Sequence, residues 1–168
     1  SCEVYGNYFY NTKIDCNENK RIINKRLSNY GQNRLFLEKF IIKKFNNYNI
    51  IRLPIVYGKG FSKNFIFDLI DNKNIEKING SDVVQIYNVK NLSTDIKKII
   101  KKKIKIINLS SPPIKVEKIA NHFFNHIIKN NEPHRIINMK SIYANKNGYY
   151  FSYKKCFEDL KKFLKYYI

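Results

Sequence analysis

Apolar positions along the chain alternate between short continuous runs and helix-like spacings. The continuous runs predict strands at residues 49–53, 83–89 and 104–109. The helical spacings predict helices at residues 30–46, 64–70, 92–100, 116–127 and 156–167. Strands that alternate with helices are typical of an α/β protein with a largely parallel sheet.

The segments around these elements are more polar. Residues 1–6 predict the end of a strand and a glycine turn, and residues 7–29, rich in Asn and Lys, predict a loop with at most a short helical piece. Pro54 stops the strand at 49–53, and residues 57–60 predict a turn. The helix Tyr30–Asn46 is apolar over a wide arc, so we expect one side to pack on a sheet and the other on a partner helix.

Composition limits the class of protein. A chain of 168 residues that is 43% hydrophobic can build a core, which excludes a disordered chain. No stretch approaches the roughly 20 apolar residues that span a bilayer, so no membrane partner is expected. Three scattered cysteines predict no disulfide framework, and a cytoplasmic setting follows. His122 and His126 have helical spacing but no third ligand, so no metal site is expected.

The net charge of +19 raises the alternative of a basic nucleic-acid-binding domain. Lys, Asn and Ile dominate the chain, and these residue types share A/T-rich codons, so a biased genome produces the same charge without a ligand. The lysines are spread along the whole chain, and the dense run at residues 97–103 ends a predicted helix, where cations are favourable. A nucleic-acid partner is therefore not the leading interpretation.

Candidate chemistry gathers at one edge of the predicted sheet. Ligands of open α/β sheets bind outside the carboxyl ends of the strands. Ser1 follows the first strand end, Tyr30 begins the next helix, and residues 54–60 follow the next strand. Tyr30 and Arg34 are four residues apart, hence neighbours on one helix face. A neighbouring cation favours a phenolate, which suits a phenol for acid–base catalysis.

Three segments in order resemble a known family. They are residues 1–6 (SCEVYG), 30–38 (YGQNRLFLE) and 52–60 (RLPIVYGKG). Together they resemble the extended short-chain dehydrogenase/reductase family, the NAD-dependent epimerases and dehydratases of nucleotide sugars. Residues 89–95 and 107–110 are similar to the family's later Val-Asp-Asp-Leu segment and its late Asn-containing strand, so the resemblance covers nearly the whole chain.

The resemblance implies a fold and a catalytic set. The fold would be α/β, the C-terminal part of a Rossmann-like parallel sheet with an interleaved small substrate-binding domain. Ser1 would position the sugar oxygen and Tyr30 would be the catalytic acid–base. Arg34 stands where the family has a lysine that holds the nicotinamide ribose, so Tyr30 and Arg34 would both be catalytic and cofactor-binding.

The resemblance also implies the ligands and the partner. Pro54 and Ile55 would flank the nicotinamide ring of NAD or NADP, and Asn64 would approach the diphosphate of a nucleotide-sugar substrate. The outcome of the reaction, whether epimerisation, dehydration or reduction, stays open. A homodimer through the Tyr30–Asn46 helix is expected, because family members usually dimerise through a bundle that includes this helix.

Two departures from the family pattern keep an alternative open. Arg34 replaces a lysine, and a planar guanidinium is not equivalent to a compact ammonium. The glycine-rich phosphate-binding turn that opens the family fold does not occur in these residues. We therefore expect residues 1–60 to be the remaining part of a dinucleotide-binding domain, preceded by roughly a hundred residues in a longer enzyme. Residues 61–168 would be the substrate-binding region interleaved with late Rossmann elements. The alternative is a truncated or degenerate, non-catalytic family member.

Overall fold

The computed structural model describes residues 1–6, 16–125, 127–144 and 146–166, and these form a mixed α/β fold with parallel strands. Within these residues the strands make three two-stranded sheets. None of the described helices combines the length and the apolar character that crossing a bilayer requires.

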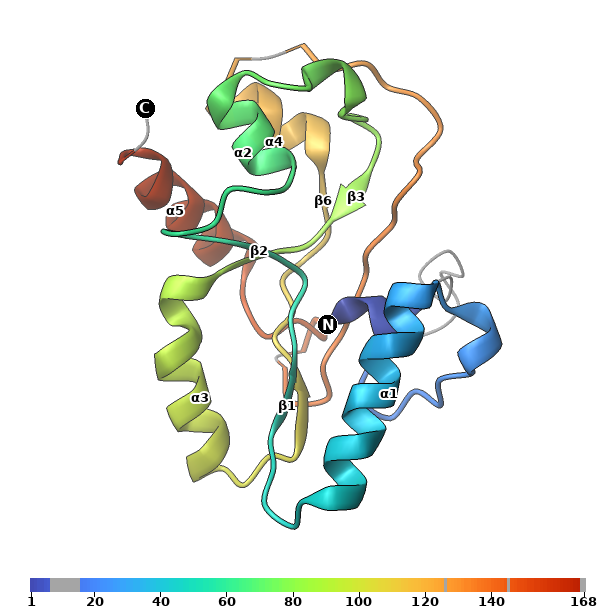
Figure 1. Ribbon diagram of the computed structural model, residues 1–168. Helices are drawn as coiled ribbons and strands as arrows, with labels where there is room; N and C mark the ends of the chain where they lie inside the picture. Colours follow the sequence, from blue (N-terminus) through green and yellow to red (C-terminus); the bar gives the residue numbers. More distant parts are fainter. Residues whose placement is uncertain (7–15, 126, 145, 167–168) are drawn as a thin grey trace.

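The first sheet pairs β1 (Ile50–Arg52) with β5 (Ile106–Asn108) in parallel. Helices α1 (Asn29–Lys44) and α3 (Leu92–Lys101) lie on either side of this pair (Figure 1). Ile99 of α3 packs with Ile107 in one apolar cluster. This part therefore has the helix–sheet–helix arrangement expected from the alternating pattern.

The rest of the chain forms a second region around two further sheets. β2 (Ile55–Tyr57) pairs in parallel with β4 (Ile86–Asn88), and β3 (Val83–Val84) pairs antiparallel with β6 (Ile114–Lys115). Three helices gather beside these strands (Figure 1) and share one apolar cluster with them. They are α2 (Phe65–Asp71), α4 (Val116–Phe123) and α5 (Tyr153–Leu164).

Short 3₁₀ helices complete the described chain. They are η1 (Cys2–Val4), η3 (Asn24–Arg26), η4 (Ile75–Lys77) and η5 (Val89–Asn91). The predicted strand end at residues 1–6 is therefore wrong, since η1 occupies this place. Its Cys2 amide nevertheless donates to the Leu53 carbonyl at 3.0 Å, which holds it against the end of β1. Of the loop predicted at residues 7–29, residues 7–15 lie outside the described part.

The strand predicted at residues 83–89 is two strands with different partners. The strand is interrupted at Gln85. The buried side-chain amide of Gln85 donates to the carbonyls of Ser111 and Met139. The Gln85 side-chain oxygen also accepts the Met139 amide at 2.8 Å. Gln85 is thus held by side-chain bonds to two distant segments, while its carbonyl still accepts the Ile55 amide at 3.1 Å.

Helix α1 differs from expectation in its burial. Leu35 and Glu38 are buried against the rest of the chain, whereas Phe36, Phe40 and Phe45 are exposed. Only one side of the apolar arc is therefore covered within the chain. The buried Glu38 carboxylate accepts three hydrogen bonds from Arg52, the shortest 2.7 Å long. A buried charge needs such a partner.

Candidate active site

Ser1 lies at the start of η1. Its Oγ accepts a hydrogen bond from the Glu3 amide at 3.3 Å and so caps this short helix. The Cys2 thiol in η1 is buried, and burial raises its pKa to about 12. The thiol therefore stays protonated near neutral pH, which excludes Cys2 as a ready nucleophile.

Tyr30 lies in the first turn of α1, directly beside η1. Ser28 caps the helix by accepting the Gly31 amide at 3.1 Å. A β-carbon at Gly31 would lie 2.5 Å from the Glu3 carbonyl oxygen, so only glycine lets the two helices approach this closely. The Tyr30 side chain is 51% exposed and accessible to a ligand.

Arg34 neighbours Tyr30, as its helical spacing predicts. The guanidinium carbon lies 4.7 Å from the centroid of the Tyr30 ring. Arg34 therefore stacks on the face of the ring, a cation–π contact. The positive charge of Arg34 therefore lies over the Tyr30 ring.

Pro54 and Ile55 lie at the corner between β1 and β2, next to Leu53, whose carbonyl accepts the Cys2 amide of η1. Pro54 is buried. Ile55 packs both on the cluster around Cys2 and on the cluster that holds α2, α4 and α5. We call the set Ser1, η1, Tyr30, Arg34 and Pro54 the η1 edge, because all of them border η1 or its neighbours.

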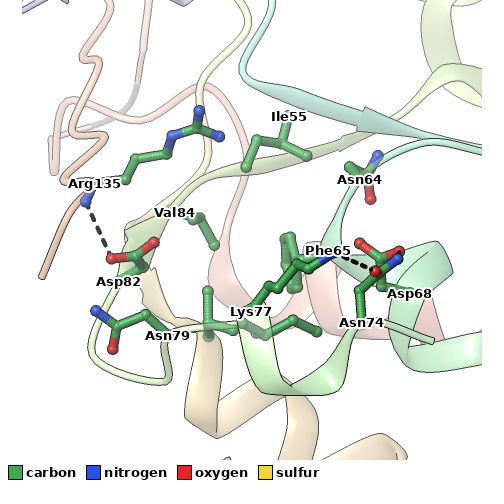
Figure 2. A pocket seen from close by; sticks show the side chains of 12 residues that line it. Ile55, Asn64, Phe65, Asp68, Asn74, Lys77, Asn79, Asp82, Val84 and Arg135 are labelled. Atoms are coloured by element: carbon green, nitrogen blue, oxygen red, sulfur yellow. Dashed lines mark hydrogen bonds between the residues drawn. The ribbon is translucent and has the colours of Figure 1, made fainter. Parts of the chain in front are cut away.

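Ile55 and Asn64 also line a pocket of about 350 Å³, shown in Figure 2. We call it the α2 pocket. Four charged side chains contribute to it, two cationic and two anionic: Lys77, Arg135, Asp68 and Asp82. The pocket thus offers cationic groups to an anionic ligand and apolar walls to the rest of it, the usual composition of a small-molecule site.

Asn64 is held in the pocket wall by its own side chain. It caps α2 by accepting the Ile66 amide at 2.9 Å, and its amide donates to the Val56 carbonyl at 2.9 Å. Its φ of 143° is unusual for a residue with a β-carbon. Such strained residues cluster at functional sites, which agrees with a role for Asn64.

Lys77 and Arg135 are site residues that the sequence pattern did not reveal. Lys77 follows α2 in the short η4 helix and donates to the Asn74 side chain at 2.9 Å. Arg135 comes from a distant segment that pairs with β3, through a bridge between Val83 and Ile136. No spacing along the chain indicates that residue 135 lies beside residue 82. Within the described residues no cluster of His, Cys, Asp and Glu suits a metal ion, and His126 lies outside them.

The comparisons with known proteins are sparse. No protein-family model and no curated protein matches the sequence. Among the similar solved structures is a dTDP-glucose 4,6-dehydratase from Bacillus anthracis in complex with NAD, at 14% sequence identity and a TM-score of 0.47. The match covers 96% of this chain and 53% of the dehydratase, so the chain spans about half the length of that protein. At this TM-score we base no argument on the similarity.

Proposed function

We propose that this chain supplies the acid–base edge and the substrate pocket of an NAD- or NADP-dependent enzyme that acts on a nucleotide-linked sugar. One observation carries the proposal. Ile55 packs on the cluster beside Cys2 and also lines the α2 pocket, so the η1 edge and the pocket are neighbours. A ligand anchored in the pocket would extend its far end toward Tyr30 and Ser1.

The pocket favours a nucleotide diphosphate as the anchored part. Lys77 and Arg135 provide the positive charge that a diphosphate needs. Phe65, Val84 and Ile55 provide apolar wall for a base or a sugar. Asn64, held by two hydrogen bonds, adds a fixed polar wall beside them.

The η1 edge supplies the proton chemistry. The proton of a sugar hydroxyl would pass to the Tyr30 oxygen while Ser1 Oγ hydrogen-bonds the same sugar oxygen. The nicotinamide cofactor supplies hydride transfer at the sugar carbon when it is bound. Tyr30 is accessible with Arg34 as the neighbouring cation, and the Cys2 amide of η1 is bonded to Leu53 next to Pro54, so these residues would hold a nicotinamide ring and its ribose.

The test is turnover by the full-length protein with a panel of nucleotide sugars and either cofactor. Replacing Tyr30→Phe removes the acid–base group and should lower kcat by about 10²- to 10⁴-fold. Tyr48→Phe is the matched control, because Tyr48 contacts Lys105 and lies away from η1 in a loop after α1. Unchanged turnover in Tyr30→Phe would reject the assignment.

A second candidate is a non-catalytic member of the same family. It is favoured by the position of Arg34, which covers the face of the Tyr30 ring instead of presenting a compact ammonium. Turnover by the wild type separates the two candidates, and an Arg34→Lys variant tests whether a compact ammonium at this position is needed for it. A catalytic protein should retain turnover in both forms, whereas the absence of turnover in wild type and variant favours the non-catalytic role.

The exposed side of α1 favours a homodimer as the working form. Phe36 is 72% exposed, and its neighbours on the same side of α1, Leu37 and Phe40, are each 45% exposed. Contiguous apolar surface of this kind marks an interface. Sedimentation of the full-length protein should give a dimer mass, and a Phe36→Asp/Phe40→Asp variant should give a monomer. A monomeric wild type would contradict the proposal.

A further inference from the structure

Residues 129–137 connect the end of the α4 region to the C-terminal part of the chain and pass beside the α2 pocket. We call this segment the strap. It has no helix of its own, and it carries Arg135. The turn at residues 79–83 holds the strap through side chains as well as backbone.

Asn79 holds the first part of the strap. Its side-chain amide donates to the Glu132 carbonyl at 2.7 Å, and its oxygen accepts the Asn131 amide at 3.2 Å. Asn79 is buried, so water competes little for these bonds.

Asp82 holds the part that carries the cation. One carboxylate oxygen accepts the His134 amide at 2.8 Å and the Arg135 amide at 3.1 Å; Figure 2 shows the bond to Arg135. The next residue, Val83, donates to the Arg135 carbonyl at 2.9 Å. Both backbone polar groups of Arg135 are therefore fixed by residues 82 and 83.

We propose that Asp82, with Asn79, is a positioning residue: it fixes the backbone of Arg135 so that the guanidinium is pre-placed for the anionic end of the substrate. This inference rests on the proposed function of the α2 pocket. Fixing a cation before binding removes an ordering cost that would otherwise weaken the complex. This role also explains why the Asp82 carboxylate lies in a pocket proposed to bind an anion: it accepts the backbone amides of His134 and Arg135.

The sign of one mutational effect distinguishes this role from simple electrostatics. Removing a carboxylate from an anion-binding pocket should strengthen anion binding, because like charges repel. Asp68→Ala is the comparison variant, since Asp68 lines the same pocket and its carboxylate accepts from the Asn74 side chain and not from the backbone of Arg135. Positioning by Asp82 predicts the opposite sign for Asp82→Ala.

The experiment is calorimetric titration of the full-length protein with thymidine, uridine, guanosine and cytidine diphosphates as probes, and the tightest of them serves for the variants. We expect Arg135→Gln to weaken binding about tenfold and Asp82→Ala about fivefold. Asp68→Ala should leave binding equal or tighter. Asp82→Asn keeps an acceptor and should stay within about twofold of wild type. In an Arg135→Gln background, Asp82→Ala should change affinity by less than about twofold, because it acts through Arg135.

Four results would overturn the inference. Tighter binding by Asp82→Ala would mean that only its charge matters, and a full fivefold loss on top of Arg135→Gln would mean that it acts independently of Arg135. Wild-type affinity in Arg135→Gln, or no binding by wild type, would reject the pocket itself and with it the proposed function. If circular dichroism shows that Asp82→Ala does not fold, Asn79→Ala replaces it, with the same weakening expected and the same dependence on Arg135.

Discussion

The η1 edge and the α2 pocket are neighbouring regions that are held together by different kinds of bonds. Below the edge, buried side chains bond to one another: Arg52 donates to Glu38 and, at 2.7 Å, to the Tyr5 hydroxyl, which also accepts from the Asn108 amide at 2.8 Å. Around the pocket, side chains of Asn64, Asn79 and Asp82 bond to backbone groups of other segments.

The difference shows how each region tolerates change. The network below the edge ties α1, η1, β1 and β5 together through a buried charge, so one missing partner leaves the other charge unsatisfied. The bonds around the pocket are neutral or single-charge contacts to backbone, and each fixes one stretch of chain. We therefore expect substitutions below the edge to lower the free energy of unfolding of the whole fold. Substitutions around the pocket should disturb only the segment that each bond fixes, unless they change the apolar core.

The largest expected effect is in the buried ion pair. Arg52→Met keeps much of the side-chain volume but leaves the Glu38 carboxylate buried without its partner, so the free energy of unfolding should fall by about 3–5 kcal/mol. Arg34→Met is the control, because Arg34 is exposed and its loss should cost less than about 1 kcal/mol. Urea denaturation followed by circular dichroism measures both. Equal losses in the two variants would show that the buried ion pair contributes no more to stability than an exposed cation does.

The next effect concerns the core beneath the pocket. Leu160 is fully buried among α2, α4 and α5, so Leu160→Ala should lower the free energy of unfolding by about 2–5 kcal/mol. Because Ile55 packs on both apolar clusters, we expect this loss to appear in the same single transition as that of Arg52→Met. A second transition that Leu160→Ala leaves unchanged would show that the two regions unfold separately.

The smallest effect is a pH dependence that belongs to the edge. Burial raises the pKa of Cys2 from 9.0 to about 12, so the folded state keeps a proton that the unfolded state loses above pH 9. The contribution of Cys2 to the free energy of unfolding is fully present below pH 9 and is lost as the pH rises toward 12. At pH 10 the loss is about 1.4 kcal/mol. Denaturation midpoints of wild type and Cys2→Ala between pH 8 and 10.5 measure it. An equally steep fall in Cys2→Ala would assign the dependence to other groups.

The regular elements follow closely from the sequence. The apolar spacing from Phe65 to Ile70 predicts α2, and the strands at Ile50–Arg52 and Ile106–Asn108 lie within the predicted runs, because local periodicity decides these elements. Elements whose shape depends on residues far away in the chain cannot be predicted from local periodicity. The break at Gln85 depends on Ser111 and Met139, and the shape of η1 depends on Leu53.

The candidate site divides in the same way. Tyr30 and Arg34 are neighbours, as helical spacing requires, and Ile55 and Asn64 share one pocket. The roles assigned to Ser1, Pro54 and the others stay predictions. Lys77 and Arg135 could not be predicted, since one belongs to a short 3₁₀ turn and the other reaches the pocket only through the pairing of the strap with β3.

The most direct test of the central claim, that the η1 edge and the α2 pocket are one site, is a crystal structure of the full-length protein with a nucleotide sugar bound. We predict the diphosphate beside Lys77 and Arg135, with a sugar hydroxyl within about 3.2 Å of the Tyr30 oxygen. A nucleotide bound outside the α2 pocket, or a sugar that points away from Tyr30, would contradict this claim.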